Sequence, residues 1–159
     1  MSHRVVRRLP PLLLVVGCGL GALAHATAFA AAPGGQYQVG AETVFDVRTR
    51  LEWARQPGAR VALADALLAC NNRPGGQWRV PSARELETLV DVRATTAPAW
   101  DRAAFGGAGG DPPVFWTLTP LPVANPPATH VVVDFRPARS VMAQAETDLG
   151  FVRCVRGPR

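Results

Sequence analysis

The stretch that most constrains the fold of this 159-residue chain is residues 75–91, GGQWRVPSARELETLVD. Its glycine pair frees the backbone, and Pro81 ends the short apolar segment 78–80. Ser82 and Glu85 have the S-x-x-E spacing of a capping box, in which two side chains satisfy the first unpaired backbone donors of a helix. We therefore expect a turn, a short strand and a capped helix here.

Residues 1–32 have the composition of a secretory signal peptide. Three arginines precede an apolar run at 12–23, and the small-residue motifs A-H-A and A-F-A follow. We expect cleavage between positions 26 and 32, a mature domain at 33–159 in the periplasm or outside the cell, and no membrane insertion after cleavage. In the alternative, the sequence Val15-Val16-Gly17-Cys18 is a lipoprotein processing site, and Cys18 carries a lipid anchor.

The charge of the mature chain argues against a nonspecific nucleic-acid binder. All seventeen basic residues are arginine, three of them lie in the leader, and all twelve acidic residues lie beyond it, so the mature chain carries a formal charge of +2. A nonspecific nucleic-acid binder carries a basic face or stripe instead. We therefore expect no nucleic-acid partner.

Two cysteines remain after the leader, Cys70 and Cys154. An even pair in an exported protein predicts one disulfide. It would close a long loop and contribute about 2–4 kcal/mol to the free energy of unfolding. The alternative is a reactive free thiol, but no activating base lies near either cysteine in the sequence.

The order of periodic segments predicts a single α+β domain. Two helical patterns, at 61–70 and from position 82, are flanked by strand-like segments on both sides. The expected strands are 37–39, 43–46, 51–54, 114–118, 130–136, 140–145 and 150–156. Segments 97–113 and 119–129 are rich in glycine and proline and are predicted to be long loops. We expect two helices packed on small antiparallel sheets, with the terminal strands brought together.

Few residues could support catalysis. His130 is the one histidine of the mature chain, and in a strand it would share a face with Asp134, as a hydrolase triad with Ser82 or Ser140 would require. Neither serine lies in a nucleophile elbow, so the simpler interpretation is a hydrogen-bonded histidine at a sheet edge. We predict no catalytic residue, no cofactor and no zinc site, because both cysteines are assigned to the disulfide.

One glycine-rich segment resembles a metal-binding repeat. Residues 106–111, GGAGGD, match a single copy of the G-G-x-G-x-D calcium repeat. A single copy cannot stack into a β-roll, so we expect a loop without metal. A calcium ion bound by this loop is the alternative.

Candidate ligand contacts come from the loops that follow position 97. Trp100 and Trp116 border these loops and could stack on a sugar, as could Tyr37. Arg102, Arg136 and Arg139 could form a cationic patch for anionic sugars. The simpler interpretations are core tryptophans and solvated turn charges.

The order of several motifs resembles the Lcl C-terminal domain family over residues 36–157. The most specific motifs are Q-W-R-V-P-S-x-x-E-L at 77–86 and the closing V-R-C-V-R at 152–156. V-F-D, L-E-W-A, A-P-A-W-D, F-W-T and V-V-D-F also occur in the order that the family shows, beginning at positions 44, 51, 97, 115 and 132.

The resemblance implies a C-type-lectin-like α+β fold, paired terminal strands and a disulfide from the first helix to the last strand. It also implies an exported bacterial protein, in some members an adhesive module for sulfated glycosaminoglycans. The calcium motifs of animal C-type lectins are absent from this sequence. We therefore predict a secreted, noncatalytic module that binds a carbohydrate or protein surface, and the alternatives are a hydrolase using His130 and Asp134 or a structural envelope protein.

Overall fold

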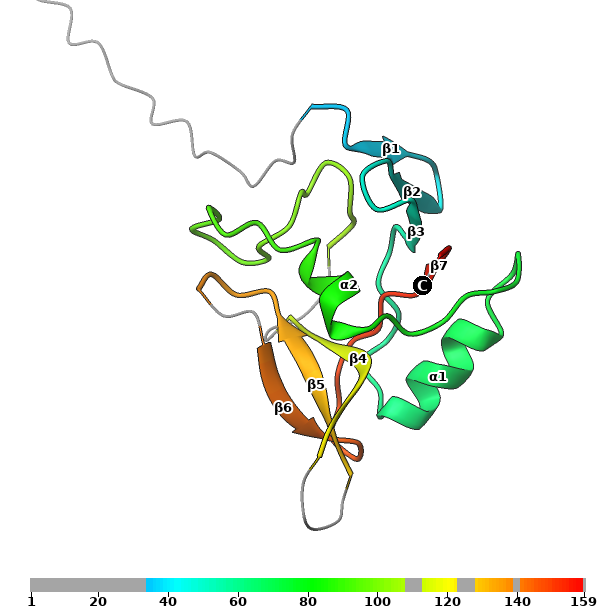
Figure 1. Ribbon diagram of the computed structural model, residues 1–159, viewed down its shortest axis with the longest axis vertical. Helices are drawn as coiled ribbons and strands as arrows, with labels where there is room; N and C mark the ends of the chain where they lie inside the picture. Colours follow the sequence, from blue (N-terminus) through cyan, green and yellow to red (C-terminus); the bar gives the residue numbers. More distant parts are fainter. Residues whose placement is uncertain (1–33, 108–112, 123–127, 139–140, 159) are drawn as a thin grey trace, which may run out of the picture.

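A computed structural model describes residues 34–107, 113–122, 128–138 and 141–158. Within these residues two small antiparallel sheets and two helices form the domain (Figure 1), which confirms the α+β prediction. In chain order the elements are β1 (Tyr37–Val39), β2 (Thr43–Asp46), β3 (Leu51–Ala54), α1 (Leu63–Asn71), α2 (Ala83–Glu87), β4 (Val114–Leu121), β5 (Thr129–Asp134), β6 (Val141–Ala145) and β7 (Val155–Arg156). The predicted leader lies outside the described residues.

The first sheet has the strand order β1-β2-β3-β7, and its first three strands match the sequence prediction. The β2–β3 hairpin closes on the buried Asp46, whose carboxylate accepts hydrogen bonds from Arg48 N (2.9 Å) and Thr49 Oγ1 (2.8 Å). Arg50 completes the turn at φ 59°. The terminal strands share this sheet, although β7 pairs with β3 and not with β1.

The second sheet has the order β4-β5-β6, and β4 extends further than predicted. Its register shifts between Trp116 and Pro120, where the Thr117 hydroxyl donates to Val131 O (2.6 Å) in place of a ladder bond. This irregularity accommodates Pro120, which has no N–H to donate. The prediction of a loop beginning at position 119 was therefore wrong, because β4 continues through the irregularity to Leu121.

The segment 75–91 forms the predicted turn and capped helix. Gly75 and Gly76 have φ of +91° and +69°, and the capping box between Ser82 and Glu85 is complete. The expected strand before Pro81 is only an isolated bridge between Arg79 and Val155. The chain turns into α2 directly after this bridge, so no ladder develops.

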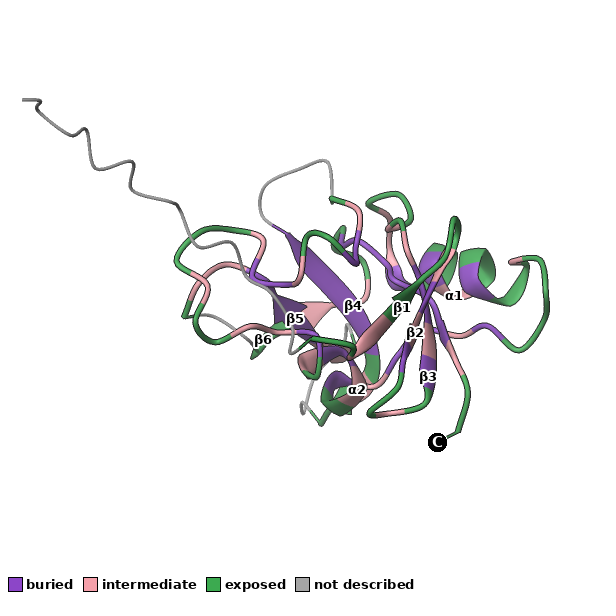
Figure 2. Ribbon diagram, turned by 90° about the horizontal axis from the view of Figure 1, so that it is seen from above, coloured by how far each residue is buried: buried purple, intermediate pink, exposed green. Residues whose placement is uncertain are grey.

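The buried residues form two apolar clusters, and Figure 2 shows them concentrated in β4, β5 and the centre of the first sheet. One cluster contains Trp100 with Phe115 and Phe135, and the other contains Trp78, Trp116 and the cysteines. The predicted disulfide Cys70–Cys154 is present and joins the end of α1 to the chain before β7.

The C-terminal segment runs between the two sheets before β7 begins (Figure 1). It was predicted as a strand over 150–156, but only Val155–Arg156 is one. The residues before β7 instead bridge separate elements, because Gly150 pairs with Val61 and Phe151 with Phe115. This segment therefore ties α1 and both sheets together.

Candidate functional site

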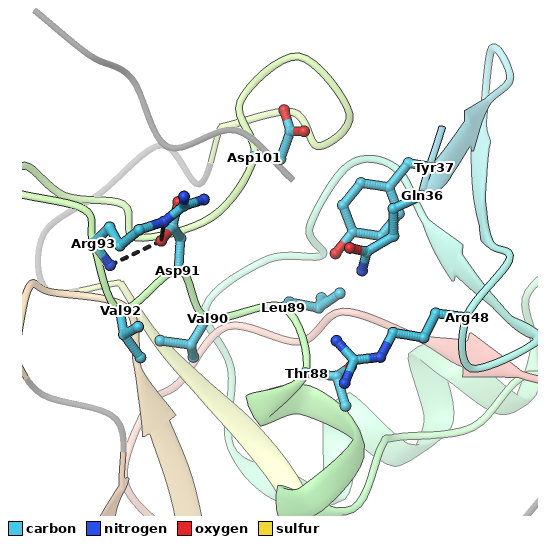
Figure 3. A pocket seen from close by; sticks show the side chains of 10 residues that line it. All are labelled: Gln36, Tyr37, Arg48, Thr88, Leu89, Val90, Asp91, Val92, Arg93 and Asp101. Carbon is cyan, nitrogen blue, oxygen red and sulfur yellow. Dashed lines mark hydrogen bonds and ion pairs between the residues drawn. The ribbon is translucent and has the colours of Figure 1, made fainter. Parts of the chain in front are cut away.

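A polar hollow of about 160 Å³ lies where β1, the β2–β3 hairpin and the chain after α2 meet (Figure 3). Its walls come from residues 36–37, Arg48, residues 88–93 and Asp101. Leu89 lies near the centre of the view, between Asp91 on one side and Tyr37 and Arg48 on the other. We call this hollow the Tyr37 pocket.

Tyr37 gives the pocket an aromatic wall with a polar end. Its ring meets Phe105 edge-on at a centroid distance of 5.0 Å, which fixes the ring plane. Burial raises the pKa of the Tyr37 hydroxyl, the charges of Asp46 and Asp101 raise this pKa further, and Arg48 opposes them. The hydroxyl therefore stays protonated at neutral pH and can both donate and accept a hydrogen bond.

Arg48 supplies a cation on the opposite side of the pocket from Asp91 (Figure 3). The buried Asp46 carboxylate accepts from the Arg48 backbone N–H and so fixes the main chain of this residue. Within the described residues no carboxylate lies within ion-pairing distance of the Arg48 guanidinium. Its fork of N–H donors therefore keeps capacity for an external acceptor.

Two aspartates line the pocket, and each also shapes its own loop. Asp91 Oδ1 accepts from Arg93 N (2.8 Å), and Asp101 Oδ1 accepts from Ala103 N (2.8 Å). The Asp91 backbone N–H also donates to Ala99 O (2.9 Å), which holds the two loops together. Both side-chain bonds of Asp91 are on Oδ1, so its Oδ2 keeps lone pairs that can accept from a ligand.

A second hollow of about 210 Å³ also borders Tyr37, with walls from residues 34, 35, 37 and 39 and from residues 101, 103 and 104. Tyr37 and Asp101 line both hollows and form the boundary between them. We call this pair with its two hollows the Tyr37–Asp101 surface.

A larger hollow of about 400 Å³ lies between Leu118 and the start of α2. Two of its polar side chains already satisfy each other, because Arg79 forms a two-bond ion pair with Glu85 (2.6 and 2.8 Å). Glu85 also accepts from Ser82 N (2.8 Å). This hollow is therefore larger than the Tyr37 pocket but offers a ligand fewer unpaired polar groups.

The structure places both candidate tryptophans in the core. Trp100 is 1% exposed and Trp116 is fully buried. Trp100 packs edge-on against Phe115 and Phe135, and Trp116 Nε1 donates to Val61 O (2.8 Å). Neither ring presents a face to solvent, so both are core residues and not sugar-stacking residues.

The candidate arginines have protein partners where they are described. Arg102 donates to Ala97 O, and Arg136 forms an ion pair with the fully buried Asp134 at 2.5 Å. Arg139 lies outside the described residues. Arg102 and Arg136 thus contribute to the positions of the chains around Ala99, whose N–H donates to Phe135 O (2.7 Å).

The residues named for a possible hydrolase triad interact with other groups and not with one another. Asp134 binds Arg136, and His130 Nδ1 lies 3.2 Å from Glu146 Oε1. Ser82 caps α2, and Ser140 lies outside the described residues.

The described residues show no group of three or more potential metal ligands. The calcium-like motif is described only at Gly106 and Gly107. Gly106 O accepts from Arg153, and a side chain at Gly106 would collide with Gln56, so packing accounts for this glycine. No helix in the described part of the chain has the length and apolar character of a membrane span.

Sequence reasoning did not find most of the pocket. It named Tyr37 as a candidate stacking residue but placed the ligand site in the loops after Trp100 and around Arg136. Gln36, Arg48 and Asp91 carry no motif, and fold alone brings them together. The available signal was the local D-x-R and D-x-A turn patterns at Asp91 and Asp101, which predict turns but not a shared pocket.

The fold and the site together define a small, disulfide-bonded α+β domain with two small adjoining hollows. The model of the Lcl C-terminal domain matches residues 42–156, and the chain belongs to this family. Comparisons with curated proteins and with solved structures found no match. The C-type-lectin-like character of the fold therefore stays a prediction.

Proposed function

We propose that this protein is an exported, noncatalytic module that binds carbohydrate through the Tyr37–Asp101 surface. The observation that carries the proposal is the Arg48 guanidinium, which faces a polar hollow without a carboxylate partner in the described residues. An aromatic ring and hydrogen-bonding side chains surround the same hollow. This combination suits a ligand with hydroxyl groups and an anionic substituent.

The size of the hollows limits what they can hold. Small-molecule sites usually enclose about 300–1,000 Å³. The Tyr37 pocket has about 160 Å³ and the neighbouring hollow about 210 Å³, so each suits one sugar unit. Because both hollows share Tyr37 and Asp101, a chain of sugars could occupy the two sides at once. We expect weak binding per site that increases when several copies act together.

The chemistry of the walls favours an acidic sugar. Arg48 can bind a carboxylate or sulfate through two parallel N–H donors. The Tyr37 hydroxyl and the Gln36 amide point toward the same space and can bind sugar hydroxyls (Figure 3). Asp91 would accept from a hydroxyl, and the negative charges of Asp91 and Asp101 would repel a second anionic group placed beside them.

The arrangement of the titratable residues supports a binding role over a hydrolase. His130 and Asp134 have separate partners, and neither lines the Tyr37 pocket. The disulfide supports export, because such bonds persist in oxidising compartments. A structural envelope protein without a ligand is the second candidate, and failure to bind in the following experiment would favour it.

The test is a glycan array that pairs uronate-containing and sulfated glycans with neutral counterparts, followed by titration calorimetry on the best ligand. We expect the acidic glycans to bind and Arg48→Gln to weaken binding about tenfold or more, which corresponds to one charge-assisted hydrogen bond. Arg50→Gln is the matched control, because it removes the same charge from the same hairpin at an exposed residue outside the pocket. Equal binding by Arg48→Gln and Arg50→Gln would contradict the proposed site.

A further inference from the structure

The Tyr37 pocket has an apolar side, which binding of an acidic sugar does not by itself require. Val90 and Val92 line the pocket on the same side as Asp91, away from Arg48 (Figure 3). Val92 is 90% exposed, the highest value for a large apolar residue in the described part of the chain, so it contributes little to the core. Val90 is partly buried against the core cluster. The pocket therefore has a cationic side at Arg48 and an apolar side at the two valines.

Asp91 lies between the two valines in the chain and adds a hydrogen-bond acceptor to the apolar side. Its Oδ1 accepts from Arg93 N (2.8 Å) and lies 3.4 Å from Arg93 Nε, so a cation already balances part of its charge. Its Oδ2 keeps lone pairs for a ligand. A cationic donor at Oδ2 would be repelled by the nearby Arg93 guanidinium, whereas a neutral N–H or O–H would not. This side of the pocket therefore suits a neutral donor that lies next to an apolar group.

We propose that the Tyr37 pocket selects an acidic sugar that carries an acetamido group, an inference that rests on the proposed function. The acetamido N–H would donate to Asp91 Oδ2, and its methyl group would cover Val90 and Val92. In a planar trans amide the N–H and the acyl methyl group lie on the same edge. One small substituent thus supplies both the donor and the apolar group that this side of the pocket accommodates.

The position of Arg48 limits where the anionic substituent can be on such a sugar. Arg48 and Asp91 lie on opposite sides of the pocket (Figure 3). The acetamido group and the anionic group must therefore project from opposite sides of the sugar ring, as substituents on carbons 2 and 6 of a hexose do. A pocket of about 160 Å³ has room for one such ring.

Other substituents would satisfy only part of this side of the pocket. A hydroxyl could donate to Asp91 but would leave both valines exposed to water. The methyl group of a deoxy sugar would cover the valines but would bring no donor to Asp91. An ammonium group would have neither the methyl group nor the neutrality that Arg93 favours.

The experiment is a set of NMR titrations on the exported, disulfide-bonded chain labelled with nitrogen-15. The ligands are N-acetylglucosamine 6-sulfate, glucosamine 6-sulfate and glucose 6-sulfate, which share the anion and differ only at carbon 2. We expect the N-acetylated sugar to bind about fourfold more tightly than either of the others, the effect of one buried methyl group. In saturation-transfer spectra its acetyl methyl protons should receive the strongest saturation.

Val92→Ser should lower this preference toward equal binding, because it removes apolar contact with the acetyl methyl group. Val47→Ser is the matched control, because it makes the same change at an exposed valine outside the pocket and should keep the preference. Arg48→Gln should weaken binding of all three sulfates alike, since they share the anion. The amide spectra of the variants establish that each is folded.

The outcomes separate this inference from the proposed function. Equal affinity for the N-acetylated and the hydroxyl sugar, with both weakened by Arg48→Gln, would overturn the acetamido site and leave the proposed function standing. A preference that persisted in Val92→Ser would also overturn the acetamido site. If none of the three sulfates bound, or if Arg48→Gln bound them as wild type does, both proposals would be overturned.

Discussion

Two arginines of this small domain, Arg153 and Arg48, have very different environments. Arg153 is fully buried between the sheets, where its guanidinium lies 5.0 Å from the Trp100 ring and 4.9 Å from the Phe105 ring. It donates to Ala54 O (2.8 Å), Arg55 O (2.6 Å) and Gly106 O (3.2 Å). Arg48 lies exposed beside the Tyr37 pocket, with no such set of acceptors in the described residues.

The comparison distinguishes an arginine that stabilises the fold from one that is available to bind a ligand. Burial lowers the pKa of Arg153 to about 9, but the three carbonyl oxygens and the aromatic rings favour its charged form, so it stays protonated at neutral pH. Its hydrogen bonds join β3 to the chain before β4. The Arg48 side chain makes no hydrogen bond or ion pair with another described residue, so its charge is available to a ligand. Substitutions in the interior around Arg153 should therefore change stability most, and substitutions in the Tyr37 pocket should change binding most.

The largest expected effect is that of Arg153→Ala. The change leaves a cavity among three aromatic rings and removes the donor from three carbonyls, so the free energy of unfolding should fall by about 3–5 kcal/mol. Urea denaturation followed by tryptophan fluorescence measures it. Arg153→Met fills more of the cavity and separates the volume effect from the loss of the donor.

Arg50→Ala is the exposed comparison and should change the free energy of unfolding by less than about 0.5 kcal/mol. If Arg153→Met were as stable as wild type, the three hydrogen bonds would contribute nothing net. Packing alone would then explain why substitutions at Arg153 destabilise the protein more than substitutions at Arg50.

The next largest effect should follow loss of the disulfide. The bond joins residues 84 positions apart, and its removal by the double change Cys70→Ala and Cys154→Ala should cost about 2–4 kcal/mol. The disulfide lies in the cluster with Trp78 and away from the Tyr37 pocket. The variant should therefore bind glycan normally wherever it is still folded. A variant of normal stability that no longer binds glycan would contradict this assignment, because the disulfide would then serve binding and not stability.

Much of the interior was predictable from the sequence because local rules determine it. The period of the apolar residues placed β1 to β3, and the S-x-x-E spacing placed the capping box. The parity of the cysteines predicted the disulfide. Segment 150–156 was mispredicted because its β-branched and aromatic residues fit a strand locally, whereas its partners come from three different parts of the fold.

The pocket was less predictable because its residues share no local pattern. Gln36 and Arg48 lie beside strands that the sheet register brings together, whereas Asp91 comes from the chain after α2. Trp100 was predicted to contact a ligand because it borders a glycine-rich loop, but its ring packs against Phe115 and Phe135 in the core. Sequence reasoning therefore found the architecture more readily than the site.

The smallest expected effect concerns Glu85, whose environment is intermediate between the two regions. Its side chain is 17% exposed and binds Arg79 at 2.6 Å. Burial alone would raise the pKa of Glu85, but hydrogen bonds from Arg79 and Ser82 outweigh it and hold the pKa below the usual 4.5. A carboxyl with a lowered folded-state pKa stabilises the fold above its unfolded-state pKa, and this contribution is lost as the pH falls through the folded-state pKa.

Glu85→Gln should therefore lower the free energy of unfolding by about 1–2 kcal/mol at neutral pH, because it removes an ion pair and weakens the capping box. The gap between variant and wild type should close below pH 4.5, since a protonated glutamic acid resembles glutamine. Glu87→Gln, two residues further along α2 and without an ion pair among the described residues, should show a much smaller gap. A gap for Glu85→Gln that stayed constant down to low pH would show that the side chain acts by its shape and not by its charge, and would place it with the packed interior.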